Sequence, residues 1–391
     1  MATSGPAGSL RAVSAPRRHA LLFAAQFFAF GVILPFLPAV LAARGMTATE
    51  VALALAIGSA LRLVAGPMGG RLADALGGPR IVLALGAAAA ALAALGFLAA
   101  SGFALLLLAY AAMSVAMAPI VPLTDAATVA AARREGFDYG RVRSAGSVAF
   151  ILAALAAGQA VALLGTDAAT LMIAAGLAAT ALAALALPAG PAPPAGARGG
   201  LAGFLAPLAI PGFRRLVLVS ALIQGSHAFY YAFGTLTWQA AGLGEGLIGA
   251  LWAIGVIAEI LLFFWGRGVV QRLGPMGLSL VAAGAGLLRW AATAFTTDPL
   301  LLFPLQVLHA GSFGAQHLAA MMVLGRIVPA QQAGTAQTLH AALGVGLPMG
   351  VLTLACGPLF ASFGGGGYLV MALLCAAAIP ASLALGAALR R

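Results

Sequence analysis

Long runs of apolar residues, separated by short stretches rich in arginine, glycine and proline, dominate the pattern along the chain. A helix that crosses a bilayer needs about 20 consecutive, mainly apolar residues. Twelve runs of about that length can be delimited, at residues 19–43, 49–70, 80–100, 103–129, 140–164, 168–188, 213–240, 246–266, 276–296, 299–324, 334–362 and 367–388. The pattern therefore predicts an all-α membrane protein with twelve transmembrane helices.

Composition and charge support this interpretation. Of the 391 residues, 63% are apolar and 7% are charged, whereas soluble proteins have about 25% charged residues. The net charge of +11 would also suit nucleic-acid binding. However, if both termini are cytoplasmic, every arginine except Arg44, Arg62 and Arg289 falls in a segment on the cytoplasmic side, as the positive-inside rule describes. We therefore expect cytoplasmic termini, a lipid bilayer around the protein and no nucleic-acid partner.

A stretch rich in proline and glycine, residues 188–211, interrupts the apolar runs. Such a composition is typical of a linker, here with a short interfacial helix at 201–209. This stretch separates the first six apolar runs from the last six. The predicted boundaries are 1–189 for an N-terminal six-helix bundle, 190–212 for a cytoplasmic linker and 213–391 for a C-terminal six-helix bundle.

The two halves resemble each other weakly. When they are aligned, Ala56-Ile57-Gly58 falls on Ala253-Ile254-Gly255, and Arg62 falls on Glu259. Parallel repeats of six helices are typical of transporters whose substrate site lies between the halves, near the middle of the bilayer. We therefore expect alternating access to a central site.

Polar signals mark both ends of the second predicted helix. Thr47 and Glu50 have the spacing of a capping box at its start. Its end, Gly70-Arg71-Leu72-Ala73-Asp74-Ala75-Leu76-Gly77-Gly78-Pro79-Arg80, resembles the loop signature of the major facilitator superfamily. That resemblance implies a gating loop with Gly70, Asp74, Gly77 and Arg80, in which the acid holds the inward gate near the start of the run 334–362. His340 in that run is either a gate contact or a packing residue, and the alternative for the loop is a solvated turn.

Four ionisable side chains lie well inside the predicted spans: Arg62, Asp125, Glu259 and Arg289. A charge at such a position costs roughly 2.5–3.5 kcal/mol, so it is expected to face water or a partner and to serve a function. Asp125 and Arg143 flank one short turn between neighbouring spans. We expect these two side chains to meet.

The segment Gly140-Arg141-Val142-Arg143-Ser144-Ala145-Gly146, together with Asp125, resembles the charge pair at the substrate site of lactose-permease-type symporters. Glu259, Arg289, His309 and His317 similarly resemble the proton site of that branch. The chain departs from the branch after His317, where Leu318 to Met322 are apolar and a further acid is missing.

A closer resemblance, to the 3-phenylpropionic acid permease family of the major facilitator superfamily, runs through most of the chain. It is carried by Pro122–Ala126, Asp138–Gly140, Gln224–Ala228, Tyr230–Tyr231, Trp238–Ala240, Val256–Glu259, Arg289–Trp290 and His317–Met321. The resemblance implies the major facilitator fold and uptake of an aromatic monocarboxylate with a proton.

Each expected role has a chemical reason. The chain has no lysine and arginine stays protonated, so carboxylates and histidines are left to carry a proton; the candidates are Glu259, Asp125 and His317. An arginine can hold a carboxylate through its planar fork. The substrate-binding candidates are Arg143, Arg289 and Arg62, with Tyr231 and Trp238 for a ring and Gln26, Gln239 and His309 as polar groups. The alternatives are a structural ion pair for Asp125–Arg143 and packing roles for the aromatic residues and for His309.

Other functions stay open or are disfavoured. Within transport, the alternatives are proton symport of a neutral sugar or nucleoside and proton-driven efflux. An enzyme is disfavoured because the few acidic residues form no cluster of paired carboxylates. No cofactor or metal motif is visible, and Cys356 and Cys375 are expected to be packing residues. We expect a monomeric transporter of the bacterial inner membrane.

Overall fold

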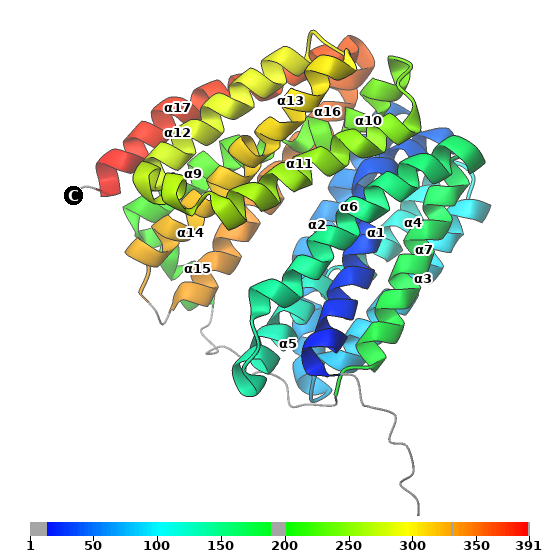
Figure 1. The fold of residues 1–391 in the computed structure, drawn as a ribbon, viewed down its shortest axis with the longest axis horizontal. Helices are drawn as coiled ribbons and strands as arrows, with labels where there is room; N and C mark the ends of the chain where they lie inside the picture. The colour runs from blue at the N-terminus through cyan, green and yellow to red at the C-terminus, as the bar shows by residue number, and fades with distance from the viewer. Residues whose placement is uncertain (1–13, 189–200, 330–331, 390–391) are drawn as a thin grey trace, which may run out of the picture.

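The computed structural model of the protein describes residues 14–188, 201–329 and 332–389, and its elements are helices (Figure 1). The first half contains α1 (Ala15–Ala43), α2 (Ala48–Ala75), α3 (Pro79–Ala99), α4 (Phe103–Met117), α5 (Ile120–Glu135), α6 (Tyr139–Leu164) and α7 (Thr166–Leu185). The second half contains α8 (Leu201–Leu205), η1 (Ala206–Ala209), α9 (Pro211–Gly225), α10 (Ala228–Ala240), α11 (Glu245–Trp265), α12 (Arg267–Thr293), α13 (Pro299–His309), η2 (Ala310–Gly314), α14 (Ala315–Ile327), α15 (Ala333–His340), η4 (Ala341–Gly346), α16 (Leu347–Phe363), η5 (Gly364–Gly367) and α17 (Tyr368–Leu389).

Eleven helical stretches of the described chain are long and apolar enough to cross a membrane. The last of them, Ala333–Leu389, has 57 residues and turns back at η5, so that α16 and α17 make separate crossings (Figure 1). The predicted all-helical class and the number of crossings therefore agree with the structure. Residues 190–200 of the predicted linker lie outside the described residues, and the expected helix at 201–209 is present as α8 and η1.

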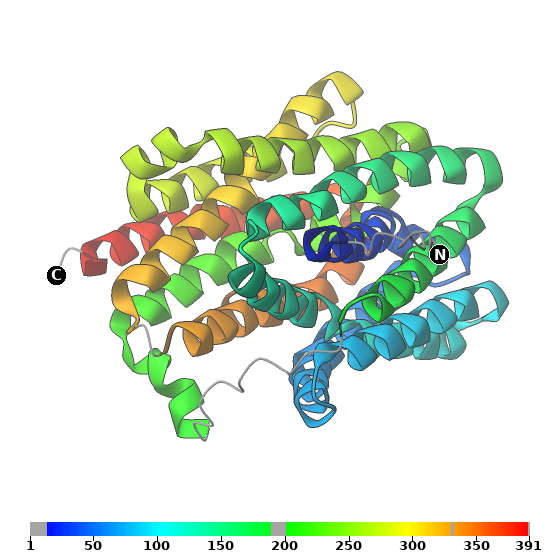
Figure 2. The ribbon, with the colours of Figure 1, turned by 60° about the horizontal axis from the view of Figure 1, so that its bottom comes forward.

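The helices form two groups, α1–α7 and α9–α17 (Figures 1 and 2). In the first group, α1 packs against α6 and α7, and α3 packs against α4 and α7. In the second, α12 packs against α14 and α17, and α9 also packs against α17. One hydrophobic cluster lies within the second group, whereas the larger cluster contains residues of both groups. The groups are therefore joined through part of their length.

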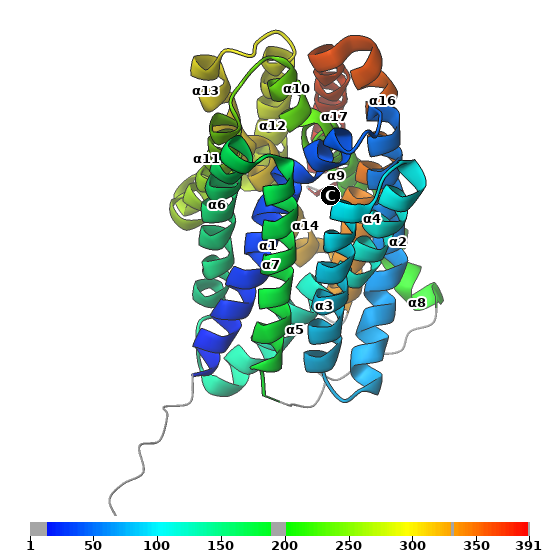
Figure 3. The same cartoon turned by 90° about the vertical axis from the view of Figure 1, so that its right-hand side faces the viewer.

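The two groups touch at one end, where α6 lies beside α11 and α2 beside α16 (Figure 3). The approach is close because the contact positions carry no side chain: a Cβ atom at Gly357 would lie 2.9 Å from Thr49 Cα and 3.0 Å from the Ala48 carbonyl oxygen. Thr235 also donates a hydrogen bond of 2.6 Å to the Pro35 carbonyl across this contact. We call this end the closed end; away from it, the ribbons of α5 and α14 diverge (Figure 1).

Four predicted spans are not continuous α-helices, which corrects the simple pattern; one of them, the run 334–362, contains η4, a segment of π-helix. The run 103–129 breaks at Pro119 between α4 and α5, because a proline ring removes a backbone donor. The run 213–240 breaks between α9 and α10, where Ser226 Oγ donates to the Ile223 carbonyl at 2.7 Å. The run 299–324 contains η2, a segment of π-helix.

The loop after α2 has the expected turn. Gly77 adopts φ 74° and α3 begins at Pro79, and the capping box of Thr47 and Glu50 at the start of α2 is confirmed. Asp74 is exposed and takes part in none of the ion pairs of the described residues. In this conformation Asp74 does not hold the loop through an ion pair. The gating roles of Gly70, Asp74, Gly77 and Arg80 therefore stay predictions.

Candidate functional site

Two cavities lie between the helix groups, and they share a wall. The polar compartment, about 680 Å³, is lined by Tyr139, Arg143, Glu259, His309 and His317, among other residues. The apolar compartment, about 540 Å³, is lined by Arg62, Met113, Met117, Met349 and further residues of both groups. Leu34, Tyr231 and Phe313 line both cavities, and we call these three residues the shared wall. Volumes of this size suit small organic ligands.

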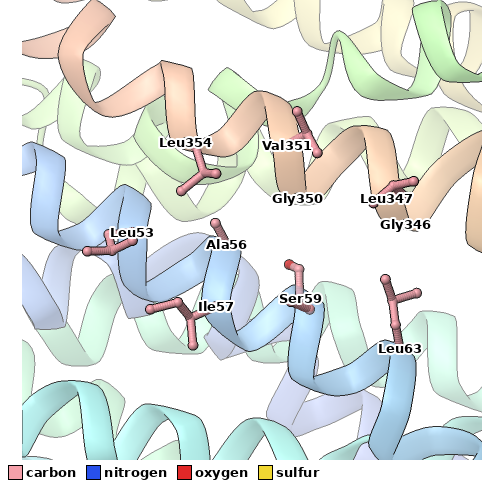
Figure 4. Close-up of a pocket in the computed structure, with 11 residues that line it drawn as sticks. Leu53, Ala56, Ile57, Ser59, Leu63, Gly346, Leu347, Gly350, Val351 and Leu354 are labelled. Carbon is pink, nitrogen blue, oxygen red and sulfur yellow. The ribbon is translucent and has the colours of Figure 1, made fainter.

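A third, smaller cavity of about 240 Å³ lies between α2 and α16 (Figure 4). Leu63 of α2 and Leu354 of α16 point into the space between the two helices, which Leu53 and Leu347 also line (Figure 4). No charged side chain lines it. It therefore offers packing space rather than a binding site for a charged solute.

Asp125 and Arg143 meet, as the sequence predicts. Arg143 Nε lies 3.6 Å from Asp125 Oδ1, and Tyr139 donates a hydrogen bond of 2.8 Å to the same oxygen. The Arg143 guanidinium also lies 5.1 Å from the centre of the Phe27 ring, within the range of a cation–π interaction. Arg143 and Tyr139 line the polar compartment, and Asp125 is behind them. Whether this pair binds substrate or carries a proton stays a prediction.

Glu259, His309 and Arg289 form a row from the polar compartment into the second helix group. Glu259 Oε2 lies 3.9 Å from His309 Nε2, and Arg289 Nη1 lies 3.0 Å from His309 Nδ1. A guanidinium has only donors, so Nδ1 must accept this bond and the imidazole proton is on Nε2, which faces Glu259. Arg289 therefore sets the tautomer of His309, and Glu259 is the group of this row that can gain or lose a proton at the cavity.

Arg289 has an unusual environment for a charged side chain. It is fully buried, and among the described residues no carboxylate lies within 4.0 Å of it. Gln306 accepts a hydrogen bond of 2.7 Å, and the guanidinium lies 4.6 Å from the Tyr230 ring centre and 4.4 Å from that of Trp290. It lines neither compartment. The predicted direct contact of Arg289 with substrate is untested, and the geometry places it behind His309.

Two π-helical segments shape the site. The segment η2 begins directly after His309 and contains Phe313 of the shared wall; η4 begins directly after His340 and contains Val345 of the apolar compartment. Such segments inside α-helices are frequent at functional sites. His340 itself is buried in the second group, where its Nε2 lies 2.8 Å from Ser220 Oγ. A packing role for His340 thus has structural support, and its gating role remains a prediction.

Arg62 projects into the apolar compartment from α2. Its guanidinium donates to Ser59 Oγ at 2.9 Å, Ser114 Oγ at 3.3 Å and Tyr110 Oη at 3.4 Å. All three acceptors are neutral hydroxyl groups. The side chain is exposed, so this arginine faces space rather than packed protein.

The remaining predicted residues divide between the cavities and the interior. Tyr231 belongs to the shared wall, and His317 lines the polar compartment. Gln26 is buried and accepts from Thr124 at 3.0 Å; Trp238 is buried; Gln239 donates to Glu245 at 2.8 Å. These last three line neither compartment, and their binding roles stay predictions.

Several site residues were missed at the level of sequence. They are Tyr139, which holds Asp125, the hydroxyl residues Ser59, Ser114 and Tyr110 around Arg62, and Gln306, which holds Arg289. Their signal was weak but present, since each is a polar group within an apolar run, or, for Tyr139, at the start of one. Polar groups in membrane helices often serve to satisfy one another.

A twelve-crossing helical protein with charged cavities between two helix groups is a secondary transporter of the major facilitator type, and the comparisons agree. Residues 19–367 match the model of the MFS_1 like family, and the chain belongs to this family of multi-pass membrane transporters, which are not enzymes. It is 32% identical to the probable 3-phenylpropionic acid transporter of Escherichia coli (strain K12), over 93% of this chain and 95% of that protein.

Two further relatives are more distant. The maltose permease of Geobacillus stearothermophilus is 28% identical, over 85% of this chain and 84% of the permease. A crystal structure of the nucleoside transporter NupG superposes with a TM-score of 0.77 at 16% identity, covering 97% of this chain and all of that one (100%). At that identity the likeness to NupG concerns the fold.

Proposed function

We propose that the protein carries a small aromatic monocarboxylate together with a proton across the bacterial inner membrane, with the helix groups 1–189 and 213–391 rocking about the cavities between them. The observation that carries the proposal is the polar compartment, in which the Glu259 carboxylate faces an imidazole whose tautomer is set by Arg289. A carboxylate in this position is the group that a transporter can protonate on one side of the membrane and deprotonate on the other.

The surroundings of Glu259 support proton coupling. His309 Nε2 lies 3.9 Å from the carboxylate, too distant for a hydrogen bond in this conformation. The acid therefore has no short bond to break when it takes up a proton. Asp125, in contrast, interacts with both Arg143 and Tyr139. A proton that binds to Asp125 would have to displace one of these partners. Glu259 is therefore the primary proposed carrier, with Asp125 and His317 as secondary candidates.

The surroundings of the cavities support an aromatic acid as the solute. Aromatic side chains are abundant in the linings, with Phe27, Phe150, Tyr230, Trp252 and Phe263 in the polar compartment, and arginines are the cations at hand. The relative in Escherichia coli is named as a probable transporter of 3-phenylpropionic acid. With the termini in the cytoplasm, as the arginine distribution suggests, the cavities of this conformation lie on the inward side of the closed end.

The test is transport by the purified protein in proteoliposomes. We expect counterflow of radiolabelled 3-phenylpropionate, and we expect its addition to acidify a pyranine-loaded lumen when no pH gradient is imposed. Maltose and uridine serve as competitors, because relatives in sequence and in fold are named for a sugar and a nucleoside. Counterflow of labelled maltose or uridine, without counterflow of 3-phenylpropionate, would favour the neutral-solute alternative. Counterflow without movement of protons would remove the coupling.

A further inference from the structure

The three arginines that are candidates for substrate binding, Arg62, Arg143 and Arg289, differ in what they are free to bind. Arg289 is fully buried and is occupied by His309, Gln306 and two aromatic rings. Arg143 is paired with Asp125. Each of these two guanidinium groups would have to give up a partner before it could receive a carboxylate.

Arg62 differs from both. Among the described residues, no carboxylate lies within 4.0 Å of it, and its three hydrogen-bond acceptors are hydroxyl groups of Ser59, Ser114 and Tyr110. Hydroxyl groups orient a guanidinium but do not neutralise it. A positive charge inside a membrane segment costs roughly 2.5–3.5 kcal/mol on insertion scales and is expected to have a counter-charge or a function. An anionic ligand would supply that counter-charge.

The space beside Arg62 suits an aromatic ring. The lining contains Phe30 and the methionines Met113, Met117 and Met349. Methionine adapts its shape and makes favourable contacts between its sulfur and aromatic rings. A cavity of about 540 Å³ with one exposed cation and an otherwise mostly apolar lining selects for a ligand that is charged at one end and apolar at the other.

The internal repeat gives independent support. Arg62 and Glu259 occupy equivalent positions in the two halves of the sequence, and the structure places them in different compartments, on α2 and α11. The same position thus presents a cation to one cavity and an acid to the other. Such a division separates binding of the anion from binding of the proton.

We propose that Arg62 is the residue that binds the substrate carboxylate, with the aromatic ring in the apolar compartment among Met113, Met117 and Met349, while the proton is bound across the shared wall at Glu259. This assignment rests on the proposed transport of an aromatic acid and says where in the protein that acid is held. Ser59, Ser114 and Tyr110 position the guanidinium for it.

The experiment compares an acid with its neutral isostere. Binding of 3-phenylpropionate and of 3-phenylpropionamide to the full-length protein in detergent is measured by calorimetry. We expect the wild-type protein to prefer the acid, and Arg62→Gln to weaken binding of the acid about 10- to 100-fold, as expected for a lost charge-assisted hydrogen bond. Binding of the amide should change less than about threefold. Arg62→Lys keeps the charge without the planar fork and should retain part of the preference for the acid.

Two other variants make the result specific. Arg141→Gln removes an exposed arginine of α6 that lines neither compartment, and the ratio of acid to amide affinity should match the wild type. Arg143→Gln tests the rival assignment. Loss of the preference in Arg143→Gln together with its retention in Arg62→Gln would overturn the proposal.

The same measurements distinguish an incorrect role for Arg62 from an incorrect proposed function. If the wild-type protein binds neither compound, the transport of aromatic acids is wrong and the assignment falls with it. If the wild type prefers the acid and folded Arg62→Gln keeps the same preference, only the role of Arg62 is wrong. Should Arg62→Gln not fold, Arg62→Lys decides: an acid-to-amide ratio equal to that of the wild type would overturn the proposal, and a reduced ratio would support it.

Discussion

The two compartments share a wall but balance their charges in opposite ways. In the polar compartment Arg143 is paired with Asp125, and Glu259 faces an imidazole that is held in turn by Arg289. In the apolar compartment Arg62 has hydroxyl partners and an apolar surround. Under the proposals above, the polar compartment binds the proton and the apolar compartment receives the anionic solute.

The difference shows how a repeated architecture can be specialised. When the two halves of the sequence are aligned, Arg62 of α2 falls on Glu259 of α11, and this position presents a cation to one cavity and an acid to the other. The shared wall makes communication between them possible, because Phe313 stacks on His309 at a centroid distance of 5.2 Å and Tyr231 on His227 at 5.9 Å. A ligand that moves Phe313 would also move the ring that faces Glu259.

The largest effect is expected for Glu259→Gln, which removes the titratable group from the polar compartment and leaves the apolar one intact. Uphill uptake driven by a proton gradient should fall at least about 100-fold, because no proton is carried with the solute, while solute exchange stays within about threefold. Both rates are measured in the same proteoliposomes, with Glu135→Gln at the exposed last residue of α5 as the matched control. An equal loss of uptake and exchange would make Glu259 a structural residue.

A smaller effect is expected when a substitution opens the shared wall between the two compartments. Phe313→Ala removes the ring of the shared wall that stacks on His309. We expect the number of protons moved per solute to fall by about half or more and binding of the acid to weaken about tenfold, since a large apolar contact is lost. Flux ratios from pyranine and radiolabel report this, and Phe295→Ala, at a side chain that is 80% exposed, is the control. An unchanged ratio would show that the wall does not couple the cavities.

Met113→Ala sharpens the comparison by changing the size of the apolar compartment alone. Met113 is 2% exposed and lines that cavity. Binding of 3-phenylpropionate should weaken up to about tenfold, because roughly 0.8 kcal/mol is lost per buried methylene group, while a naphthyl acid gains relative to it. The ratio of the two affinities is the measurement, since it does not depend on stability. Met172→Ala lies outside both linings and should leave the ratio unchanged; a shift there of similar size would contradict the placement of the ring.

The smallest effect is expected far from both compartments. Thr47→Ala removes the capping box of α2, in which Glu50 N donates to Thr47 Oγ1 at 3.3 Å and Thr47 N donates to Glu50 Oε2 at 2.8 Å. The free energy of unfolding should fall by about 1 kcal/mol, visible as a small decrease in the melting temperature in detergent. Acid-to-amide selectivity should not move. A change in selectivity would mean that the outer end of α2 controls the position of Arg62.

Much of the fold was predictable because the bilayer imposes length and hydropathy on each crossing. The runs 19–43 and 140–164, for example, correspond to α1 and α6. The contact between Asp125 and Arg143 was also predictable, since a short turn forces neighbouring helices to run side by side. These features depend on sequence spacing alone.

The direction in which a residue faces was not predictable in the same way. A helix that is apolar on all sides carries little information about its rotation, so the depth of Arg289 followed from its position in the chain, whereas its burial behind His309 did not. The π-helical segments η2 and η4 were missed because a π-segment requires no characteristic residue type. Both segments were needed to place Phe313 and Val345 in the linings, and for this reason the division into two compartments emerged only from the structure.

The glycine contact between α2 and α16 at the closed end also affects how opening of the protein can be regulated. At Gly357 the seam is made of backbone and Cβ atoms, without ionic or titrating groups, so its strength should be insensitive to salt and acidity. The bulky side chain of a Gly357→Trp variant would separate α2 from α16. It would hold the protein open at this end instead of at the end where α5 and α14 diverge. If access alternates as proposed, such a variant would offer the two cavities to reagents that cannot cross the membrane.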